Sequence, residues 1–283
     1  MQLISKKLTK NHKIFFASDF HEGTIMKHKH GVQQFIKHVL SDKNNYVVIG
    51  GDLAEAILID DKRYSAETMD ANTSVPLLQY QAIVKEFLPI KDRIITILQG
   101  NHDAKLDKYG NFVRDYVCKE LNVPYGTYSS KITIKDLKGN NQYKIFVTHG
   151  SRNISSSADD PIRREANMKL SLKRILSDKA GDCVLMCQGH SHKLLVADPL
   201  SKLYLTDNET EIKSNYTASL HNGDNYIHPD HRYFISSGSF LKLYGDMGIS
   251  GYAEIFGYDP VELGYAVATI ENGIIKTVDK VVL

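Results

Sequence analysis

The sequence contains no tryptophan, only three cysteines among its 283 residues, and no long uninterrupted run of apolar residues. The number of cysteines is odd, and none of the pairs among Cys118, Cys183 and Cys187 has the spacing of a metal finger or a redox pair. We therefore interpret them as small core residues of a protein in a reducing compartment. No window reaches the roughly 18 apolar residues of a membrane span. The N-terminus also lacks the apolar core of a secretory signal. We therefore expect a cytoplasmic protein with no membrane partner.

The charge is nearly balanced, with 35 Lys and Arg against 33 Asp and Glu, a net of +2. This balance is not typical of a dedicated nucleic-acid-binding domain, although it is compatible with a local basic patch at a site. Hydrophobic residues make up 42% of the chain, which is ordinary for a globular protein. The length favours a single domain over residues 1–283.

The first half of the chain alternates predicted strands with predicted helices. Short apolar runs predict strands at 13–18, 46–49 and 94–98, and helical spacing predicts helices at 31–40 and 76–88. Such a β-α-β-α-β order favours a parallel sheet with helical crossovers. Further along we predict helices at 112–121 and 166–176, a hairpin turn at 138–141, and strands at 128–134, 143–147, 183–187, 233–236, 266–270 and 274–282.

Five polar motifs occur at the ends of predicted strands or just after them. Strand ends are where α/β folds place their chemistry. Aspartate, asparagine and histidine together suit Mn²⁺, Fe, Zn²⁺ or Mg²⁺ rather than copper–thiolate or iron–sulfur chemistry. Asp-x-His, Gly-Asp and His-Gly alone are common in turns and loops, Gly-His-Ser-His and Gly-Asn-His-Asp are more specific, and all five in order indicate a metal site. They are Asp19-Phe20-His21, Gly51-Asp52, Gly100-Asn101-His102-Asp103, His149-Gly150 and Gly189-His190-Ser191-His192.

The spacing within two motifs predicts how their side chains are directed. In an extended chain, residues i and i+2 lie on the same face, so Asp19 and His21 can hold one ion together. His190 and His192 repeat that spacing. The carboxylate of Asp52 follows two glycines and can bridge two ions about 3.5–4 Å apart.

As an ordered set over about residues 13–195, these motifs resemble those of the calcineurin-like metallophosphoesterases. The resemblance implies an α/β fold, a four-layer αββα sandwich of two mixed β-sheets with flanking helices. It also implies two divalent metal ions, with Mn²⁺ favoured and Fe, Zn, Ni or Mg as alternatives. The implied first metal is held by Asp19, His21, Asp52 and His192. The implied second is held by Asp52 as the bridge, Asn101, His149 and His190, with His102 as the catalytic histidine.

One position departs from the family pattern. Many members carry Gly-Asp-x-x-Asp in the second motif, whereas this chain has Glu55 in place of the second aspartate. Two interpretations stay open: Glu55 orients His102 through its longer side chain as part of the catalytic machinery, or it is a surface charge. The following Ala56-Ile57-Leu58 argues against the protein-phosphatase subgroup, which typically has arginine there.

The resemblance and the donor set together predict hydrolysis of a phosphodiester, in a nucleotide or nucleic acid, by a hydroxide bridging the two metals. His102 as an imidazolium would protonate the leaving alkoxide. A phosphomonoesterase or a DNA exonuclease of the same fold is the alternative within this class. A non-catalytic scaffold of the same fold is the alternative from another class.

Two segments without clear periodicity, 151–164 and 201–230, are expected to be irregular insertions that wall the site. In the first, Arg152, Arg163 and Arg164 are either substrate-binding residues, since guanidinium groups bind phosphate, or solvated surface charges. In the second, the irregular spacing of His221, His228 and His231 argues against a third metal. Nearby tyrosines either stack a base or pack in the core; they are Tyr216, Tyr226 and Tyr233.

Overall fold

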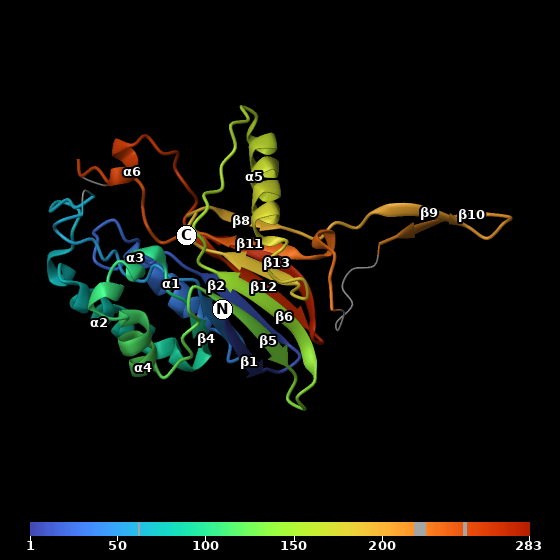
Figure 1. The fold of residues 1–283 in the computed structure, drawn as a ribbon, viewed down its shortest axis with the longest axis horizontal. Coiled ribbons are helices and arrows are strands. Elements are labelled where there is room, and N and C mark those ends of the chain that lie inside the picture. Colours follow the sequence, from blue (N-terminus) through green and yellow to red (C-terminus); the bar gives the residue numbers. More distant parts are fainter. Residues whose placement is uncertain (62, 218–224, 246–247) are drawn as a thin grey trace.

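Two β-sheets packed face to face form the centre of the protein (Figure 1). This computed structural model describes residues 1–61, 63–217, 225–245 and 248–283. One sheet contains, in spatial order, β1 (Gln2–Lys7), β5 (Ser129–Lys135), β6 (Asn141–Thr148), β7 (Leu185–Gln188), β11 (Tyr233–Ser237) and β8 (Leu194–Ala197). The other contains β13 (Ile274–Val282), β12 (Gly264–Glu271), β2 (His12–Ala17), β3 (Asn45–Ile49) and β4 (Ile94–Ile97).

The second sheet confirms the predicted β-α-β-α-β unit. Strands β2, β3 and β4 are parallel neighbours, and the chain crosses between them through helices α1 and α2. β12 then pairs antiparallel with β2 and β13 with β12, which makes the sheet mixed. In the first sheet β5 and β6 form the predicted antiparallel hairpin, and β6 runs parallel to β7.

Apolar side chains from both sheets meet in the interior. Phe16 and Val48 of one sheet share a buried cluster with Ile145 and Ile235 of the other. The outer face of each sheet is covered by helices in separate clusters, one around Phe35 and Tyr80 and one around Leu172 and Phe234. The order helix, sheet, sheet, helix is therefore the predicted four-layer sandwich.

The helices follow their apolar periodicity. Val32, Phe35 and Val39 recur on one face of the first helix and are fully buried, because that face packs on the sheet. The segment predicted as a helix at 112–121 begins with one π-helical stretch, Val113–Val117. The α-helices are α1 (Lys29–Leu40), α2 (Pro76–Phe87), α3 (Asn101–Ala104), α4 (Cys118–Leu121), α5 (Pro161–Leu176) and α6 (Tyr252–Ile255).

Part of the segment expected to be irregular at 151–164 is helical. Helix α5 begins at Pro161 rather than at 166, so Arg163 and Arg164 lie in its first turn. The start signal was present in the sequence: the side chain of Asp160 accepts a hydrogen bond from the Arg163 backbone N–H, and proline follows at the first helical position. The expectation of irregular structure was wrong for residues 161–164.

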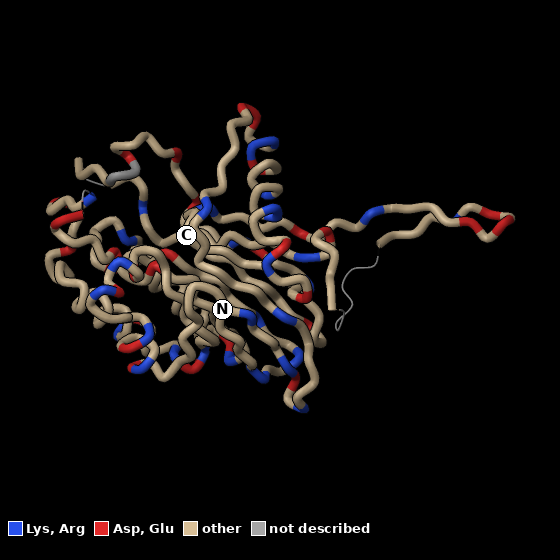
Figure 2. The backbone as a smooth tube through the Cα atoms, in the orientation of Figure 1, with Lys and Arg blue, Asp and Glu red and all other residues tan. Residues whose placement is uncertain are grey.

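The second segment expected to be irregular contains a hairpin. Strands β9 (Leu203–Asp207) and β10 (Ile212–Tyr216) pair antiparallel and extend away from the two sheets as an arm (Figure 1). The expectation that 201–230 is irregular and walls the site is therefore wrong for residues 203–216. Lys and Arg are interspersed with Asp and Glu over the fold, and acidic residues gather at the hairpin tip (Figure 2). The structure also adds two unpredicted strands, β1 and β8.

The three cysteines are buried and free, as predicted. Burial raises the pKa of the Cys118 and Cys183 thiols to about 12, so both remain protonated, unreactive core side chains near neutral pH. In the part of the chain that the structure describes, no helix combines the length and apolar character required to cross a bilayer.

Arg232 is fully buried at the start of β11 and forms hydrogen bonds to main-chain carbonyls. Its Nε donates to the Ile227 carbonyl over 2.6 Å, and its Nη1 donates to the carbonyls of Ser177 and Ala180 over 2.8 and 3.2 Å. The guanidinium also lies over the ring of Tyr226, with 5.2 Å between Cζ and the ring centroid. Arg232 thus joins the end of α5 to the chain that enters β11.

We expect Arg232→Met to lower the free energy of unfolding by about 2–4 kcal/mol, because buried carbonyls lose their donors. Urea denaturation at neutral pH measures the change. Arg114→Met, at an exposed arginine paired with Asp115, is the control and should leave the free energy of unfolding nearly unchanged. Equal stability of the two variants would contradict the role of Arg232.

Candidate metal centre

All seven predicted ligands follow the carboxyl ends of strands that lie next to one another. In one sheet the donors come after β2, β3 and β4, which are parallel and therefore end at the same edge. In the other sheet they come after β6 and β7, which are also parallel. The seven residues are Asp19, His21, Asp52, Asn101, His149, His190 and His192.

The backbone at these positions is strained rather than extended. Asp19, His21, Asp52, His190 and His192 have φ angles of 58°, 48°, 49°, 66° and 54°, in the left-handed region. The extended geometry expected for Asp19-x-His21 and His190-x-His192 was therefore wrong. Side chains other than glycine rarely adopt such angles, which cost on the order of 1–3 kcal/mol each and cluster at functional sites.

Packing compensates for this strain in the first motif. Between Asp19 and His21, the fully buried ring of Phe20 stacks on Phe240 with 4.6 Å between ring centroids, and it meets Phe87 edge-on at 5.0 Å. The aromatic anchor points into the core and leaves the two flanking polar side chains in the site.

Asp19, His21 and His192 form the first group of donors. Asp19 Oδ1 lies 3.2 Å from His192 Nε2, and His21 Nε2 lies 3.3 Å from the same nitrogen. The other ring nitrogen of His21, Nδ1, is 2.7 Å from the Glu55 carboxylate and must donate to it. His21 Nε2 therefore presents a lone pair to the group.

The first group fits a cation. Asp19 Oδ1 is buried and has no hydrogen-bond partner, although buried carboxylate oxygens are normally satisfied. Its neighbours are the Nε2 atoms of His192 and His21, and the His21 Nε2 atom carries a lone pair because the proton is on Nδ1. A divalent cation satisfies such a set of oxygen and nitrogen donors, and Asp, His and His are suitable ligands for it.

Asp52, Asn101, His149 and His190 form the second group. Asn101 Oδ1 lies 3.0 Å from His149 Nε2 and 2.6 Å from His190 Nδ1, and Asp52 Oδ2 lies 3.3 Å from His149 Nε2. His149 Nδ1 faces the Gly50 carbonyl at 2.8 Å, so this nitrogen carries a proton and Nε2 faces the other donors. The two groups adjoin, since the His190 N–H donates to Asp19 Oδ2 over 3.0 Å.

The pKa shifts show that this pocket favours positive charge. Burial alone would lower the pKa of His149, but the Asp52 carboxylate and the Gly50 carbonyl raise it to about 9. Burial alone would raise the pKa of Asp52, but His149, His102 and His21 hold it far below its ordinary value. The Asp52 carboxylate thus interacts with imidazoles of both donor groups, which agrees with the expectation that the two ions share it.

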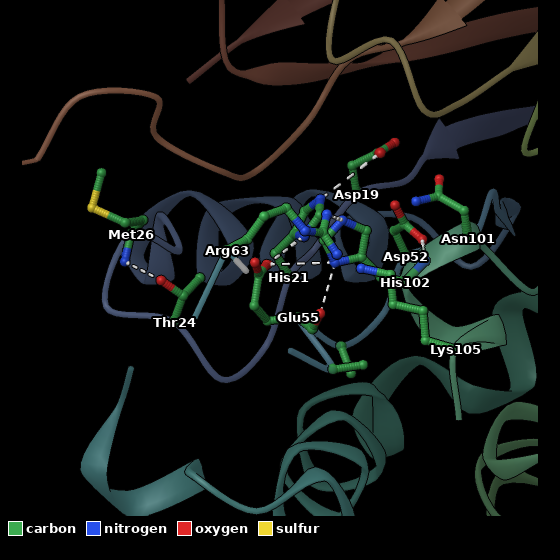
Figure 3. A network of polar contacts seen from close by, with 12 residues as sticks. Asp19, His21, Thr24, Met26, Asp52, Glu55, Arg63, Asn101, His102 and Lys105 are labelled. Carbon is green, nitrogen blue, oxygen red and sulfur yellow. Dashed lines mark hydrogen bonds and ion pairs between the residues drawn. The ribbon is translucent and has the colours of Figure 1, made fainter. Parts of the chain in front are cut away.

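His102 lies beside the donors on the first turn of α3 (Figure 3). Its backbone N–H donates to Asp52 Oδ1 over 2.8 Å, and its Nδ1 donates to the main-chain carbonyl of Glu55 over 2.6 Å. The Glu55 carboxylate is 3.9 Å from His102 Nδ1 but 2.7 Å from His21 Nδ1. Glu55 is buried, so it is not the surface charge that one interpretation allowed, and its side chain is closer to a predicted ligand than to His102.

Sequence reasoning missed several residues that hold the motifs in place. Asp103 accepts hydrogen bonds from the backbone N–H groups of Leu53, Ala54 and Gly100, and so ties the second motif to the third. On the opposite side, Ser239 Oγ donates to the Asp19 carbonyl. Both residues had a signal in the sequence: Asp103 is the acid that ends the Gly-Asn-His-Asp motif, and Ser239 follows a predicted buried strand.

Two glycines allow the second and third motifs to approach each other. A Cβ on Gly51, whose φ is +98°, would lie 2.7 Å from the backbone nitrogen of Gly100. A Cβ on Gly100 would lie 2.0 Å from Asp52 Oδ1. Larger residues at these positions would push Asp52 out of its place.

Arg63 is another residue that sequence reasoning missed. Its Nη1 lies 3.4 Å from His102 Nε2, while its Nε and Nη2 hold the Asp61 carboxylate over 3.1 and 2.9 Å. Arg63 belongs to the segment that follows the second motif. It places a guanidinium next to the predicted catalytic histidine.

Of the three arginines predicted to bind substrate, Arg163 and Arg164 lie in the first turn of α5, whereas the Arg152 carbonyl accepts a hydrogen bond from Gln188 at the end of β7. Arg164 Nε donates to the Ala158 carbonyl, and the side chains of Arg152 and Arg163 are exposed. Among the described residues, none of the three hydrogen-bonds to a predicted ligand. Their role remains a prediction.

The histidines and tyrosines of the second predicted insertion lie elsewhere. His228 caps a short 3₁₀ turn before β11, and His221 falls outside the described residues. Tyr216 belongs to the hairpin arm, Tyr226 packs against Arg232, and Tyr233 is buried in β11.

Comparisons with known proteins place the chain among phosphoesterases. The family model described as calcineurin-like phosphoesterase matches residues 12–221. No curated protein matches. Vps29 from Chaetomium thermophilum is 11% identical with a TM-score of 0.40, over 96% of this chain and 97% of that one. The NAD nucleotidase NadN from Haemophilus influenzae is 12% identical with a TM-score of 0.40, over 96% of this chain and 50% of that one. These structural likenesses are too distant to indicate function.

The family match covers well over half of the chain, and it includes all five motifs. It agrees with the four-layer fold and with the candidate metal ligands gathered at the strand ends. The chain belongs to the calcineurin-like phosphoesterases.

Proposed function

We propose that this protein is a metal-dependent phosphodiesterase with two divalent ions, acting on a phosphodiester of a nucleotide or nucleic acid. The observation that carries the proposal is the pair of adjoining donor groups, one containing a buried carboxylate oxygen without a partner, with His102 beside them. A two-metal site suits phosphoryl chemistry because the phosphate is anionic and its transition state spreads negative charge.

The residues divide naturally between two ions. Asp19, His21 and His192 would hold the first, and Asn101, His149 and His190 the second, with Asp52 shared. When bound, divalent ions at such a site offset phosphate charge and supply an acidified water as the nucleophile. The oxygen and nitrogen donors suit Mn²⁺, with Fe, Zn, Ni or Mg as alternatives.

His102 is the proposed acid for the leaving alkoxide. Because Nδ1 donates to the Glu55 carbonyl, Nε2 is the nitrogen that can pass a proton to substrate. Burial alone would lower the pKa of His102, but the charges of Asp52 and Glu55 raise it above its ordinary value. The nearby Arg63 guanidinium opposes this shift, and the net direction favours the protonated ring that the proposal requires.

Glu55 is a positioning residue in this proposal. Its carboxylate accepts a hydrogen bond from His21 Nδ1, so that the lone pair of His21 Nε2 would be directed at the first ion, as carboxylates commonly do for metal-binding histidines. Its main-chain carbonyl fixes His102. Arg152, Arg163 and Arg164 are further candidates to contact the substrate from the α5 side.

A non-catalytic scaffold of the same fold is the second candidate function. The donors and His102 are all present, and nothing in their arrangement would serve a protein partner alone. A phosphomonoesterase or a DNA exonuclease would use the same centre, and substrate comparison separates them from the main proposal.

We expect hydrolysis of bis-p-nitrophenyl phosphate with Mn²⁺, faster than hydrolysis of p-nitrophenyl phosphate, followed at 405 nm, the usual absorbance of the released p-nitrophenolate. Digestion of single-stranded oligonucleotides tests the exonuclease version. Protein that has bound metal, but turns over neither ester nor any oligonucleotide, would leave the scaffold as the better account.

We expect Asp52→Asn to lower the bound metal from about two ions per chain and to abolish turnover, because the amide removes a charge shared by both ions. Metal content is measured by inductively coupled plasma mass spectrometry after dialysis. Asp182→Asn, at a carboxylate paired with Lys131 and Lys144 away from the donors, is the control and should retain both ions. Wild-type metal content and rate in Asp52→Asn would contradict the shared role.

We expect His102→Ala to keep both ions and to reduce kcat by at least about 10²-fold, because the alkoxide then leaves without a proton. The loss should be smaller for a p-nitrophenyl ester, whose leaving group is acidic, than for an alkyl or nucleoside ester. Equal losses for both esters would argue that His102 acts in another way.

A further inference from the structure

A cavity of about 300 Å³ opens beside the candidate metal centre. Glu55 and Arg63 line it, and both contact His102: the Glu55 carbonyl lies 2.6 Å from Nδ1 and Arg63 Nη1 lies 3.4 Å from Nε2. Figure 3 shows Arg63, Glu55 and His102 together, with Thr24 and Met26 of the cavity on one side of them and Asn101 on the other. Glu55 and Arg63 therefore lie between the cavity and His102.

The cavity lies on the His102 side of the centre. Among the described residues, none of the seven predicted ligands lines it, and the two lining residues that contact His102 are Glu55 and Arg63. In the proposed reaction His102 protonates the departing alkoxide, so a group bound in this cavity is the alcohol that leaves. The group that stays on phosphorus would lie elsewhere.

The lining combines apolar side chains with hydroxyl groups and with the charged groups of Glu55, Arg63 and Lys242. Met26 and Ile57 are buried, and Met69 joins them, while Phe256 lines the mouth with its ring largely exposed. Methionine and phenylalanine make favourable contacts with aromatic faces. Ser65 and Ser250 add hydroxyls to the lining. An aromatic group that also carries hydroxyls matches this lining, and a volume near 300 Å³ is at the small end of ligand sites.

Arg63 stands at the junction of the cavity and the centre. Asp61 holds it through Nε and Nη2, and Lys105 Nζ contacts the same carboxylate over 3.0 Å. This ion pair fixes the guanidinium so that Nη1 faces His102, where the ester oxygen of a substrate would lie. A guanidinium held in this way is suited to a phosphate oxygen.

We infer that this cavity is the leaving-group pocket of the enzyme, that it takes a nucleoside-sized aromatic alcohol, and that Arg63 contacts the phosphate ester at its mouth. The inference rests on the proposed function and narrows it to phosphodiesters whose leaving group is one nucleoside. A longer nucleic-acid strand would be hydrolysed only if its terminal nucleoside enters the pocket.

The test fills the pocket and leaves the donors intact. Ser250→Trp is the filling variant, and Ser201→Trp, at an exposed serine before the hairpin arm, is the matched control. Two substrates share one leaving group: bis-p-nitrophenyl phosphate and methyl p-nitrophenyl phosphate. We expect Ser250→Trp to lower kcat/KM by about 10-fold or more for both, with unchanged metal content, and Ser201→Trp to match wild type. A loss confined to the bis-ester would place the other ester group in the cavity and overturn the inference.

Adenosine and inorganic phosphate serve as inhibitors that separate the pocket from the centre. We expect adenosine to compete with substrate in the wild type and Ser201→Trp but not in Ser250→Trp, and phosphate to inhibit all three. Absence of competition by adenosine in the wild type would overturn the nucleoside assignment.

A third variant tests the arginine. Arg63→Gln should lower kcat/KM by about 10-fold through the lost phosphate contact, while Arg114→Gln should not. A wild-type rate in Arg63→Gln would remove Arg63 from the inference.

These outcomes are distinct from failure of the proposed function. If wild-type protein with bound metal hydrolyses no ester, the proposed function fails, and calorimetric titration with adenosine still tests the pocket. If hydrolysis occurs but Ser250→Trp and Arg63→Gln behave as wild type, only the pocket fails.

Discussion

Repulsion between buried donor atoms is the constraint on which the candidate centre depends. Asp19 and Asp52 are carboxylates removed from water, and the nitrogens facing them are partly committed as lone pairs by the Glu55 carboxylate and the Gly50 carbonyl. Uncompensated charge at such depth is costly. The Asp52 carboxylate favours protonation of His149 and raises its pKa to about 9. A cation relieves the same repulsion, so proton and metal compete for one pocket.

The rest of the fold holds these donors against that repulsion and against backbone strain. Two sheets bring five strand ends to one region, and the left-handed residues are fixed by bonds from outside their own motifs. Asp103 reaches three backbone N–H groups in two motifs, and Phe20 anchors the first motif in the aromatic core. Strain of a few kcal/mol is sustained because many neighbours determine each turn. Contacts within the fold therefore place the donors without the help of a ligand.

Local sequence patterns predicted most of the strands and helices, because the spacing of apolar residues and the local composition determine these elements. The parallel strands before Asp19, Asp52 and Asn101 are short β-branched runs, and their shared direction brings the donors to one edge. Details set by tertiary contacts were not predictable in this way. The hairpin at 203–216 has mostly exposed residues and no buried face to impose alternation. The left-handed turns at Asp19 and His21 arise because neighbouring loops fix them, which no local propensity records.

The consequence of glutamate at position 55, where many family members carry aspartate, can be seen only in the three-dimensional structure. An aspartate side chain is one methylene shorter and would end farther from His21. Glutamate reaches His21 Nδ1, and the main chain takes over the contact with His102. The same residue also lines the cavity that holds Arg63 at its mouth. One position therefore couples the direction of a metal ligand, the tautomer of the proposed acid and the wall against which a leaving group would rest. A side-chain change there would remove the contact with His21 and alter the cavity wall, while the main-chain carbonyl that holds His102 would remain. A change at Ser250 reaches only the pocket, whereas a change at Arg63 reaches the pocket and His102.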